Sequence, residues 1–290
     1  MKTNIPLTDN FLFKALFSQQ EDLLMDLLNS FPEFQNEKKI LKIKVLNPEL
    51  PKVEDIEKLS ILDIHAEDGF GNKFLIEMQS QIEVGFEKRI LFYWSKIYTK
   101  SLKKGEQYSL LPKIYSISFL EFDLLKTKNY HFVFQLREKE NPEIVLTEDI
   151  EFHIINLNKL IKPNTEFETW LYMLKKCHEL KGEEMSALVK KNPKLKKVLK
   201  EYKDYTSNPK NKSFLEARKK SRLVLNGQLA AAQEKGREEG REEGREEGIE
   251  KERYDTTKIL ILKGFTIEEI SEITGLTKKQ ILEFKKKISK

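Results

Sequence analysis

Residues 59–79 read LSILDIHAEDGFGNKFLIEMQ, and this stretch predicts both the centre of the fold and the functional site. Two apolar-rich runs flank the turn-forming sequence GFGN, which is the pattern of a β-hairpin. If the turn pairs Glu67 with Lys73, the register of every other pair is fixed. Asp63 then lies directly opposite Glu77, which puts two carboxylates on one face of the sheet.

Two carboxylates at directly opposed positions have Cβ atoms about 5 Å apart, and like charges so placed destabilise a sheet. A divalent cation bound between Asp63 and Glu77 would turn this repulsion into a net attraction. Strand alternation puts Gln79 on the face of Glu77, and His65 on the face of Asp63. Such oxygen ligands suit Mg²⁺ or Mn²⁺. The alternative interpretation is that the two acids face solvent. His65 is interpreted as a structural or substrate-side residue and not as a metal ligand.

The flanking segments predict an α/β domain with a mixed sheet. A helix is expected from the capping residues Thr8 and Asp9 to the stop at Phe31-Pro32. The expected elements after it are a strand at 41–45, the hairpin, a helix at 84–104, strands at 114–122, 130–136 and 150–157, and helices within 166–205 broken by Gly182 and Pro193.

Composition excludes several classes of protein. Cys177 is the only cysteine, so an internal disulfide and a cysteine zinc site are excluded. The four histidines are scattered with no pair at metal-ligand spacing along the chain, which argues against a zinc module. No apolar run approaches the roughly 20 residues of a membrane span, and the N-terminus does not read as a signal peptide. The sequence therefore predicts a soluble, cytoplasmic protein that does not engage a membrane.

The composition changes after about residue 208, where a helix candidate runs into GREEGREEGREEG. Glycines recur there at every fourth position, and each costs a helix interior about 1 kcal/mol. We interpret this stretch as a solvated helical spacer. The alternative is a small-residue stripe along which two helices approach closely.

The last segment, TTKILILKGFTIEEISEITGLTKKQILEFKKKISK, predicts three short helices. Thr266 with Glu269, and Thr277 with Gln280, have the spacing of capping boxes. The Thr-Gly-Leu turn resembles that of a helix-turn-helix, and a lysine-rich stretch that begins at Lys278 and Lys279 follows it. Two interpretations stay open, DNA contact and a three-helix oligomerisation or docking module.

The segment LDIHAEDGFGNKFLIEMQ resembles the catalytic pattern of the PD-(D/E)XK nuclease superfamily. The chain is more specifically similar to the recombination-promoting nuclease family, a transposase-like group. The opening helix, the segment RILFYWSKIYTKSLKKGEQY, the strand IYSISFLEF and the glycine-rich C-terminal region support this resemblance.

The resemblance implies a restriction-endonuclease-like core of order αβββαβ, with Asp63 and Glu77 holding the metal and Gln79 as a further catalytic residue. Gln79 stands where the superfamily usually has lysine, and an amide carries no charge and cannot act as a general base. Lys14, Arg89 and Tyr93 match positions typical of the family, where a positive charge could offset phosphate or position the strand. We therefore expect Lys14 to be catalytic and Arg89 and Tyr93 to contact DNA. The alternatives are a solvated helix residue for Lys14 and an aromatic core residue for Tyr93.

The expected domains are a nuclease-like domain at 1–208, a helical linker at 209–253 and a helix-turn-helix-like tail at 254–290. The protein is expected to be a Mg²⁺- or Mn²⁺-dependent DNA endonuclease that acts in DNA recombination, element mobility or defence. The C-terminal helical region is a candidate for forming homo-oligomers. Two alternatives remain: a catalytically degenerate nuclease fold that binds DNA or protein, and a transcription regulator that reads DNA through its last three helices.

Overall fold

The computed structural model describes residues 5–46 and 64–288. The chain divides into two compact units, Met1–Leu215 and Glu216–Lys290, which are described separately.

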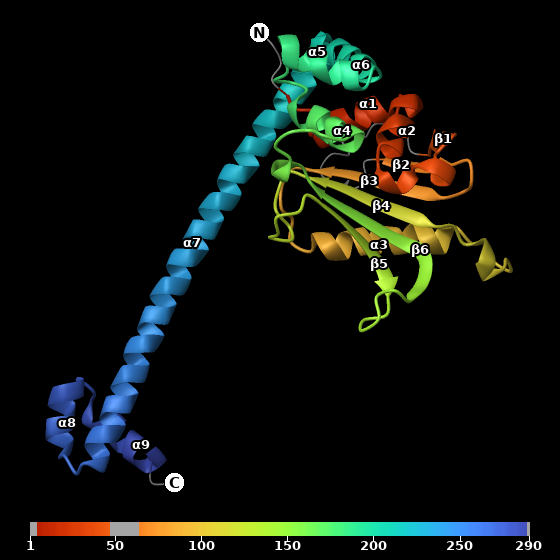
Figure 1. The fold of residues 1–290 in the computed structure, drawn as a ribbon. Helices are drawn as coiled ribbons and strands as arrows, with labels where there is room; N and C mark the ends of the chain where they lie inside the picture. Colours follow the sequence, from red (N-terminus) through yellow and green to blue (C-terminus); the bar gives the residue numbers. More distant parts are fainter. Residues whose placement is uncertain (1–4, 47–63, 289–290) are drawn as a thin grey trace. The chain divides into compact units, whose positions relative to one another are not determined.

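The first unit is built on a six-stranded mixed sheet in the order β1-β2-β3-β4-β6-β5 (Figure 1). Its strands are β1 (Ile43–Val45), β2 (Ile64–Asp68), β3 (Lys73–Gln79), β4 (Ile114–Leu120), β5 (His131–Arg137) and β6 (Val145–Asn156). β3 and β4 pair in parallel, as do β4 and β6, while the other three pairs are antiparallel. The predicted mixed sheet, with a core of order αβββαβ, is confirmed.

The predicted hairpin register is confirmed at the four described pairs, which run from Glu67 opposite Lys73 to Ile64 opposite Ile76. Asp68 fixes the turn, because its Oδ1 accepts hydrogen bonds from the backbone N–H groups of Phe70 and Asn72 at 2.8 and 2.9 Å. Asp63, which the prediction places opposite Glu77, lies outside the described residues.

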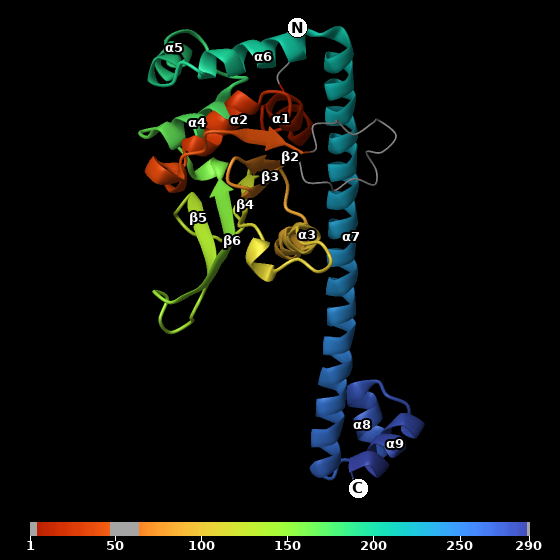
Figure 2. The same cartoon turned by 90° about the vertical axis from the view of Figure 1, so that its right-hand side faces the viewer.

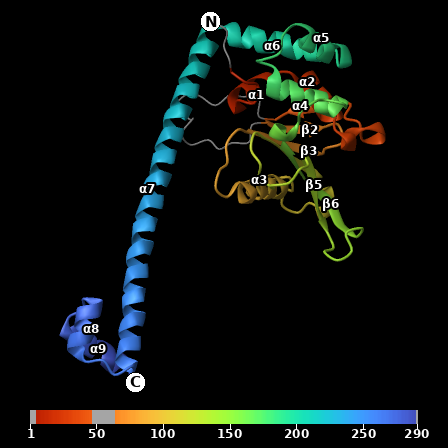
Figure 3. The same ribbon diagram turned by 60° about the vertical axis from the view of Figure 1, so that its left-hand side comes forward.

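Helices cover both faces of the sheet. The helices on one face are α1 (Asn10–Phe17), α2 (Glu21–Asn29) and α4 (Glu166–Lys176), with α5 (Gly182–Lys191) and α6 (Leu195–Ser207) packed on their outer side (Figures 1 and 3). The opposite face carries α3 (Phe86–Lys100), as Figure 2 shows. Short 3₁₀ helices lie at Pro32–Phe34 (η1), Asn36–Lys38 (η2), Tyr108–Leu110 (η4) and Leu157–Lys159 (η5).

Because side chains alternate along the strands, each face of the sheet contributes residues to a separate apolar core. Phe74, Ile76 and Met78 of β3 belong to the large core beneath α1, α2 and α4. Leu75 faces the other way and packs with Ile114 against aromatic residues of α3. The two faces of β3 are therefore covered by different helices, and the odd-numbered residues of this strand lie on the α3 side.

The single helix predicted between Thr8 and Phe31 is wrong in one respect, because the chain forms two helices there. Asp9 caps α1 as predicted, accepting the Leu12 N–H at 3.2 Å, and Ser18 ends that helix. Every residue of α1 from Phe11 to Phe17 is buried, whereas α2 buries only one stripe of leucines. The break between them reorients the chain so that both can reach the core.

The second unit contains most of α7 (Pro209–Leu262), together with α8 (Ile267–Thr274) and α9 (Lys278–Ile288). Both predicted capping boxes are present, and Gly264 and Gly275 have positive φ at helix ends. A Cβ added at the repeat glycines, Gly236 to Gly248, would meet nothing within 4 Å, so no other described segment packs on them. Among the described helices, none has both the length and the apolarity that crossing a membrane requires.

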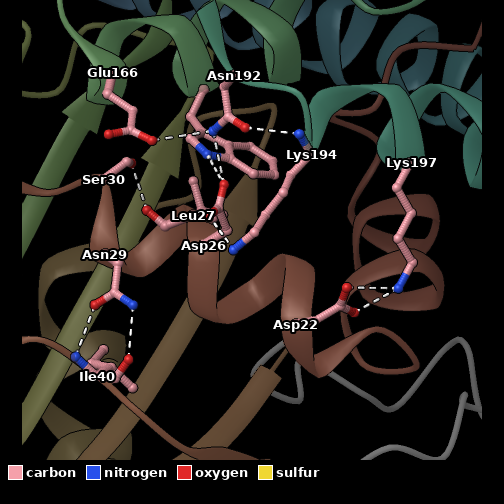
Figure 4. A network of polar contacts seen from close by, with 11 residues as sticks. Asp22, Asp26, Leu27, Asn29, Ser30, Ile40, Glu166, Asn192, Lys194 and Lys197 are labelled. Carbon is pink, nitrogen blue, oxygen red and sulfur yellow. Dashed lines mark hydrogen bonds and ion pairs between the residues drawn. The ribbon is translucent and has the colours of Figure 1, made fainter. Parts of the chain in front are cut away.

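A polar network on α2 connects the N-terminal helices to the later ones (Figure 4). Asp26 accepts hydrogen bonds from Trp170 Nε1 at 3.1 Å and from Asn192 Nδ2 at 2.8 Å, and pairs with Lys194 Nζ at 2.6 Å. Trp170 is fully buried in α4, and Asn192 and Lys194 lie between α5 and α6. One carboxylate thus satisfies donors from two segments that are more than 140 residues away in sequence.

We predict that Asp26→Ala lowers the free energy of unfolding by about 1–3 kcal/mol, because it leaves the buried Trp170 Nε1 without an acceptor and Asn192 Nδ2 with Glu166 alone, at 3.3 Å. The matched control is Asp22→Ala on the same helix, whose ion pair with Lys197 is half exposed at both side chains. That change should cost less than about 1 kcal/mol. Urea denaturation measures both variants, and equal losses would contradict the prediction.

Candidate active site

The candidate active site lies on the α3 side of β3. Glu77 is opposite Ser118 of β4 in the parallel register and is only 8% exposed, although it carries a carboxylate. Gln79 is also 8% exposed and is opposite Leu120. An acidic side chain this deep in a central strand is costly unless other groups compensate its charge.

Arg89 supplies that compensation from α3. Gly85 precedes the helix with a φ of 80°, a left-handed conformation that glycine adopts without strain. In the first turn of α3, Arg89 donates through Nη2 to Glu77 Oε1 and through Nη1 to Glu83 Oε2. One guanidinium is therefore shared by a buried carboxylate and a half-exposed one.

Gln79 stands at one end of a chain of four side chains. Its Nε2 donates to Glu83 Oε1 at 2.8 Å and to the backbone oxygen of Gln81 at 3.1 Å. Since Glu83 also accepts from Arg89, and Arg89 donates to Glu77, the contacts run in sequence from Gln79 to Glu77. The amide of Gln79 is thus oriented by its NH₂ group.

Burial raises the pKa of the Glu77 carboxyl above its ordinary value; Arg89 opposes that shift and Glu83 adds to it. Oε1 of Glu77 accepts from Arg89, but Oε2 is buried and has no hydrogen-bond partner among the described residues. A buried carboxylate oxygen that lacks a donor is the atom that a cation would satisfy. The described half of the site therefore fits a divalent metal.

His65 lies across the hairpin from Leu75, on the same side as Glu77. Burial and the nearby Lys73 charge lower its pKa to about 4, so the imidazole is neutral at pH 7. Lys73 itself donates to Ser101 Oγ at the end of α3, at 2.8 Å. A neutral ring in this place adds no positive charge to the site.

The other predicted site residues are distributed as follows. Asp63 lies outside the described residues, so its partnership with Glu77 stays a prediction. Lys14 is buried on α1, and its catalytic role stays a prediction. Tyr93 is half-buried on α3 and packs with the Leu75 cluster. In the second unit, Lys278 pairs with Glu268 at 2.6 Å, and Lys279 is exposed.

Sequence reasoning missed two features. Glu83 links Gln79 to Arg89 from a loop ahead of α3, and its only signal was a carboxylate six residues before Arg89. The second feature is on the other face of the sheet, where Glu33, His131 and His153 place one ligand atom each within 4.8 Å of one another. The spacing of histidines along the chain gave no sign of it, because the two residues are 22 positions apart and meet only through the β5–β6 register, which contains shifts.

The chain matches the family described as "PD-(D/E)XK nuclease family transposase" over residues 6–232. A search of the curated proteins found no match, and neither did a search of the solved structures. The matched range covers most of the chain, which therefore belongs to this family of nuclease-fold proteins, and the resemblance noted from the sequence is confirmed. The α/β architecture with a mixed six-stranded sheet is consistent with a restriction-endonuclease-like fold.

Membership of this family supports a nuclease-type function. Nucleases of the PD-(D/E)XK class use divalent metals and act on DNA, and the cation-compatible environment of Glu77 agrees with the use of a metal.

We predict that Arg89→Gln lowers the free energy of unfolding by about 1–3 kcal/mol at neutral pH, because it leaves the buried Glu77 carboxylate without its cation. The loss should shrink as the pH falls towards the raised pKa of Glu77, since protonation removes the buried charge. Lys96→Gln removes a charge from the exposed side of α3 and should stay within about 0.5 kcal/mol of the parent. Denaturant titrations at two pH values test this, and an Arg89 deficit that grows on acidification would refute it.

Proposed function

We propose that the protein is a metal-dependent DNA endonuclease in which Asp63 and Glu77 hold Mg²⁺ or Mn²⁺. The observation that carries the proposal is the buried Glu77 Oε2, which has no described partner although it lies on a central strand of a nuclease-family fold. The confirmed hairpin register supports Asp63 as the second carboxylate, because that register leads from the four described pairs towards position 63.

The bound metal would activate a water molecule and stabilise the charge that develops on the phosphate. The residues of the chain prepare for this. Arg89 holds Glu77 by one oxygen and leaves the other for the metal, and it limits the cost of burying the carboxylate. Gln79 is positioned by Glu83 to offer an amide beside the site, where it can orient water but cannot remove its proton.

The uncharged Gln79 replaces the lysine that is usual in the superfamily, so the site lacks a fixed positive charge at that position. We propose that cleavage is consequently slow or strongly dependent on the metal. A second candidate function is a degenerate nuclease fold that binds DNA or a protein. The ion pair between Arg89 and Glu77 favours it, because Arg89 already supplies a cation to the carboxylate.

We propose DNA contact through Arg89 and Tyr93 near the site and through the lysines of the tail. The guanidinium of Arg89 is engaged by two carboxylates in the described geometry, so its contact with a phosphate would compete with Glu83, the more exposed of the two.

The proposed organisation is a nuclease domain at 1–208, a linker at 209–253 and a DNA-binding or oligomerising tail at 254–290. We propose that it acts on cytoplasmic DNA, in recombination, element mobility or defence.

We predict that the purified protein nicks or linearises plasmid DNA with Mg²⁺ or Mn²⁺ and is inactive with EDTA. Asp63→Asn and Glu77→Gln should each abolish cleavage, because each removes a charged metal ligand while preserving side-chain size. Glu67→Gln is the matched control, since Glu67 lies in the same hairpin but pairs with Lys73 near the turn. It should cleave at the rate of the parent.

Agarose-gel assays measure cleavage, and circular dichroism checks that each variant is folded. If the parent binds DNA but cleaves with no metal, and neither acid affects binding, the binding-module function replaces the endonuclease.

We predict different contributions from the two tail lysines to DNA binding. A lysine that neutralises one phosphate contributes about 0.9 to the slope of log K against log salt concentration. Lys279→Gln should reduce the slope by about that amount, whereas Lys278→Gln should reduce it less, because Lys278 is paired with Glu268. Fluorescence anisotropy of the full chain over a salt series measures both slopes, and unchanged slopes in both variants would exclude tail contact with phosphates.

A further inference from the structure

A second cluster of ligating side chains lies on the face of the sheet opposite Glu77. It contains Glu33 of η1, His131 of β5 and His153 of β6, and one ligand atom from each lies within 4.8 Å of the others. The two imidazoles approach most closely, with His131 Nε2 and His153 Nδ1 3.0 Å apart. None of these residues takes part in the proposed nuclease site.

Strand pairing explains why residues 22 positions apart in sequence meet. His131 is opposite Ile155 and His153 is opposite Val133 in the antiparallel β5–β6 register, so the two histidines are diagonal neighbours on one face. Their rings stack with centroids 5.2 Å apart, and the ring of Phe31 covers both edge-on at 5.8 and 5.6 Å. The sheet and η1 thus hold both rings in an aromatic enclosure.

Glu151 orients the inner imidazole. Its Oε2 accepts from Lys113 Nζ at 2.9 Å and from Gln135 Nε2 at 2.8 Å, which are donor groups only. Its Oε1 lies 3.0 Å from His153 Nε2, so Nε2 carries the proton and donates it. His153 therefore presents the lone pair of Nδ1 towards His131 and Glu33. A histidine ligand with a carboxylate behind it is the usual arrangement at protein metal sites.

Glu33 provides the negative charge. Its Oε2 is buried and has no hydrogen-bond partner among the described residues, which is costly for a carboxylate oxygen. Glu33 belongs to a short 3₁₀ helix, is only half-buried, and places a carboxylate oxygen within 4.8 Å of the imidazole nitrogens. Two imidazole nitrogens and one carboxylate form a ligand set that Zn²⁺ and related transition metals prefer, whereas Mg²⁺ prefers oxygen ligands.

We propose that Glu33, His131 and His153 bind one divalent transition metal, with Zn²⁺ as the preferred ion, at a site separate from the nuclease centre. The metal joins η1, which lies between α2 and β1, to the β5–β6 pair, and so stabilises the domain. Without metal the same nitrogens form a hydrogen-bonded chain, in which His131 donates to His153 and His153 donates to Glu151.

The test loads the full-length protein with Zn²⁺, removes loosely bound ion by desalting with excess Mg²⁺, and measures retained zinc by mass spectrometry. We expect one zinc per chain and a higher thermal midpoint than for the EDTA-treated protein. Glu33→Gln and His131→Gln should lose the retained zinc, and Glu151→Gln should weaken binding by about 10- to 100-fold. Co²⁺ loading should give a visible absorption spectrum typical of imidazole ligation.

Two controls separate this site from other binding. His178→Gln removes a histidine outside the cluster, and Glu77→Gln removes the proposed nuclease ligand, and both should retain one zinc. Because the readouts are metal content and stability, absence of DNA cleavage does not affect them. If the parent retains no zinc and its thermal midpoint does not respond, or if Glu33→Gln and His131→Gln retain zinc as the parent does, the cluster is only a hydrogen-bonded chain and the proposal fails.

Discussion

The position of β3 at the centre of the sheet constrains everything around it. This strand is hydrogen-bonded on both sides, antiparallel to β2 and parallel to β4, and six of its seven residues are buried. Alternation sends Phe74, Ile76 and Met78 into the large core, so Glu77 and Gln79 must lie under α3. A buried carboxylate in that position requires a cation, and Arg89 at the start of α3 provides one. The site is therefore a consequence of strand burial as much as of local sequence.

The sequence predicted what depends on short-range rules. The Asp68 turn fixes the hairpin register, and the capping residues at Asp9, Thr266 and Thr277 mark real helix starts. It could not predict the break at Ser18, because Leu16 and Leu23 are spaced by about two helical turns, as in one continuous helix, nor Glu83, which reaches Arg89 from a loop.

The pairing of His131 with His153 shows the same limit more clearly. It depends on a register between β5 and β6 that contains shifts at Gln135 and Leu136, which residue spacing does not encode.

The two clusters of ligating residues also differ in the groups that surround their carboxylates. Glu77 has a guanidinium beside it, whereas Glu33 lies beside two imidazoles. The ligand types also differ, and oxygen ligands suit hard ions whereas imidazole nitrogens suit a softer ion.

The two edges of the sheet have a consequence for how the protein behaves at high concentration. β1 spans only three residues, and β5 exposes Val133, Phe134 and Leu136 by 40–45% along the opposite edge. An edge strand with exposed apolar side chains can pair with a strand of another chain, which promotes aggregation. The register shifts after Gln135 interrupt the ladder there, and Arg137 adds charge at the end of the strand. These irregularities limit open-ended strand addition along this apolar edge strand.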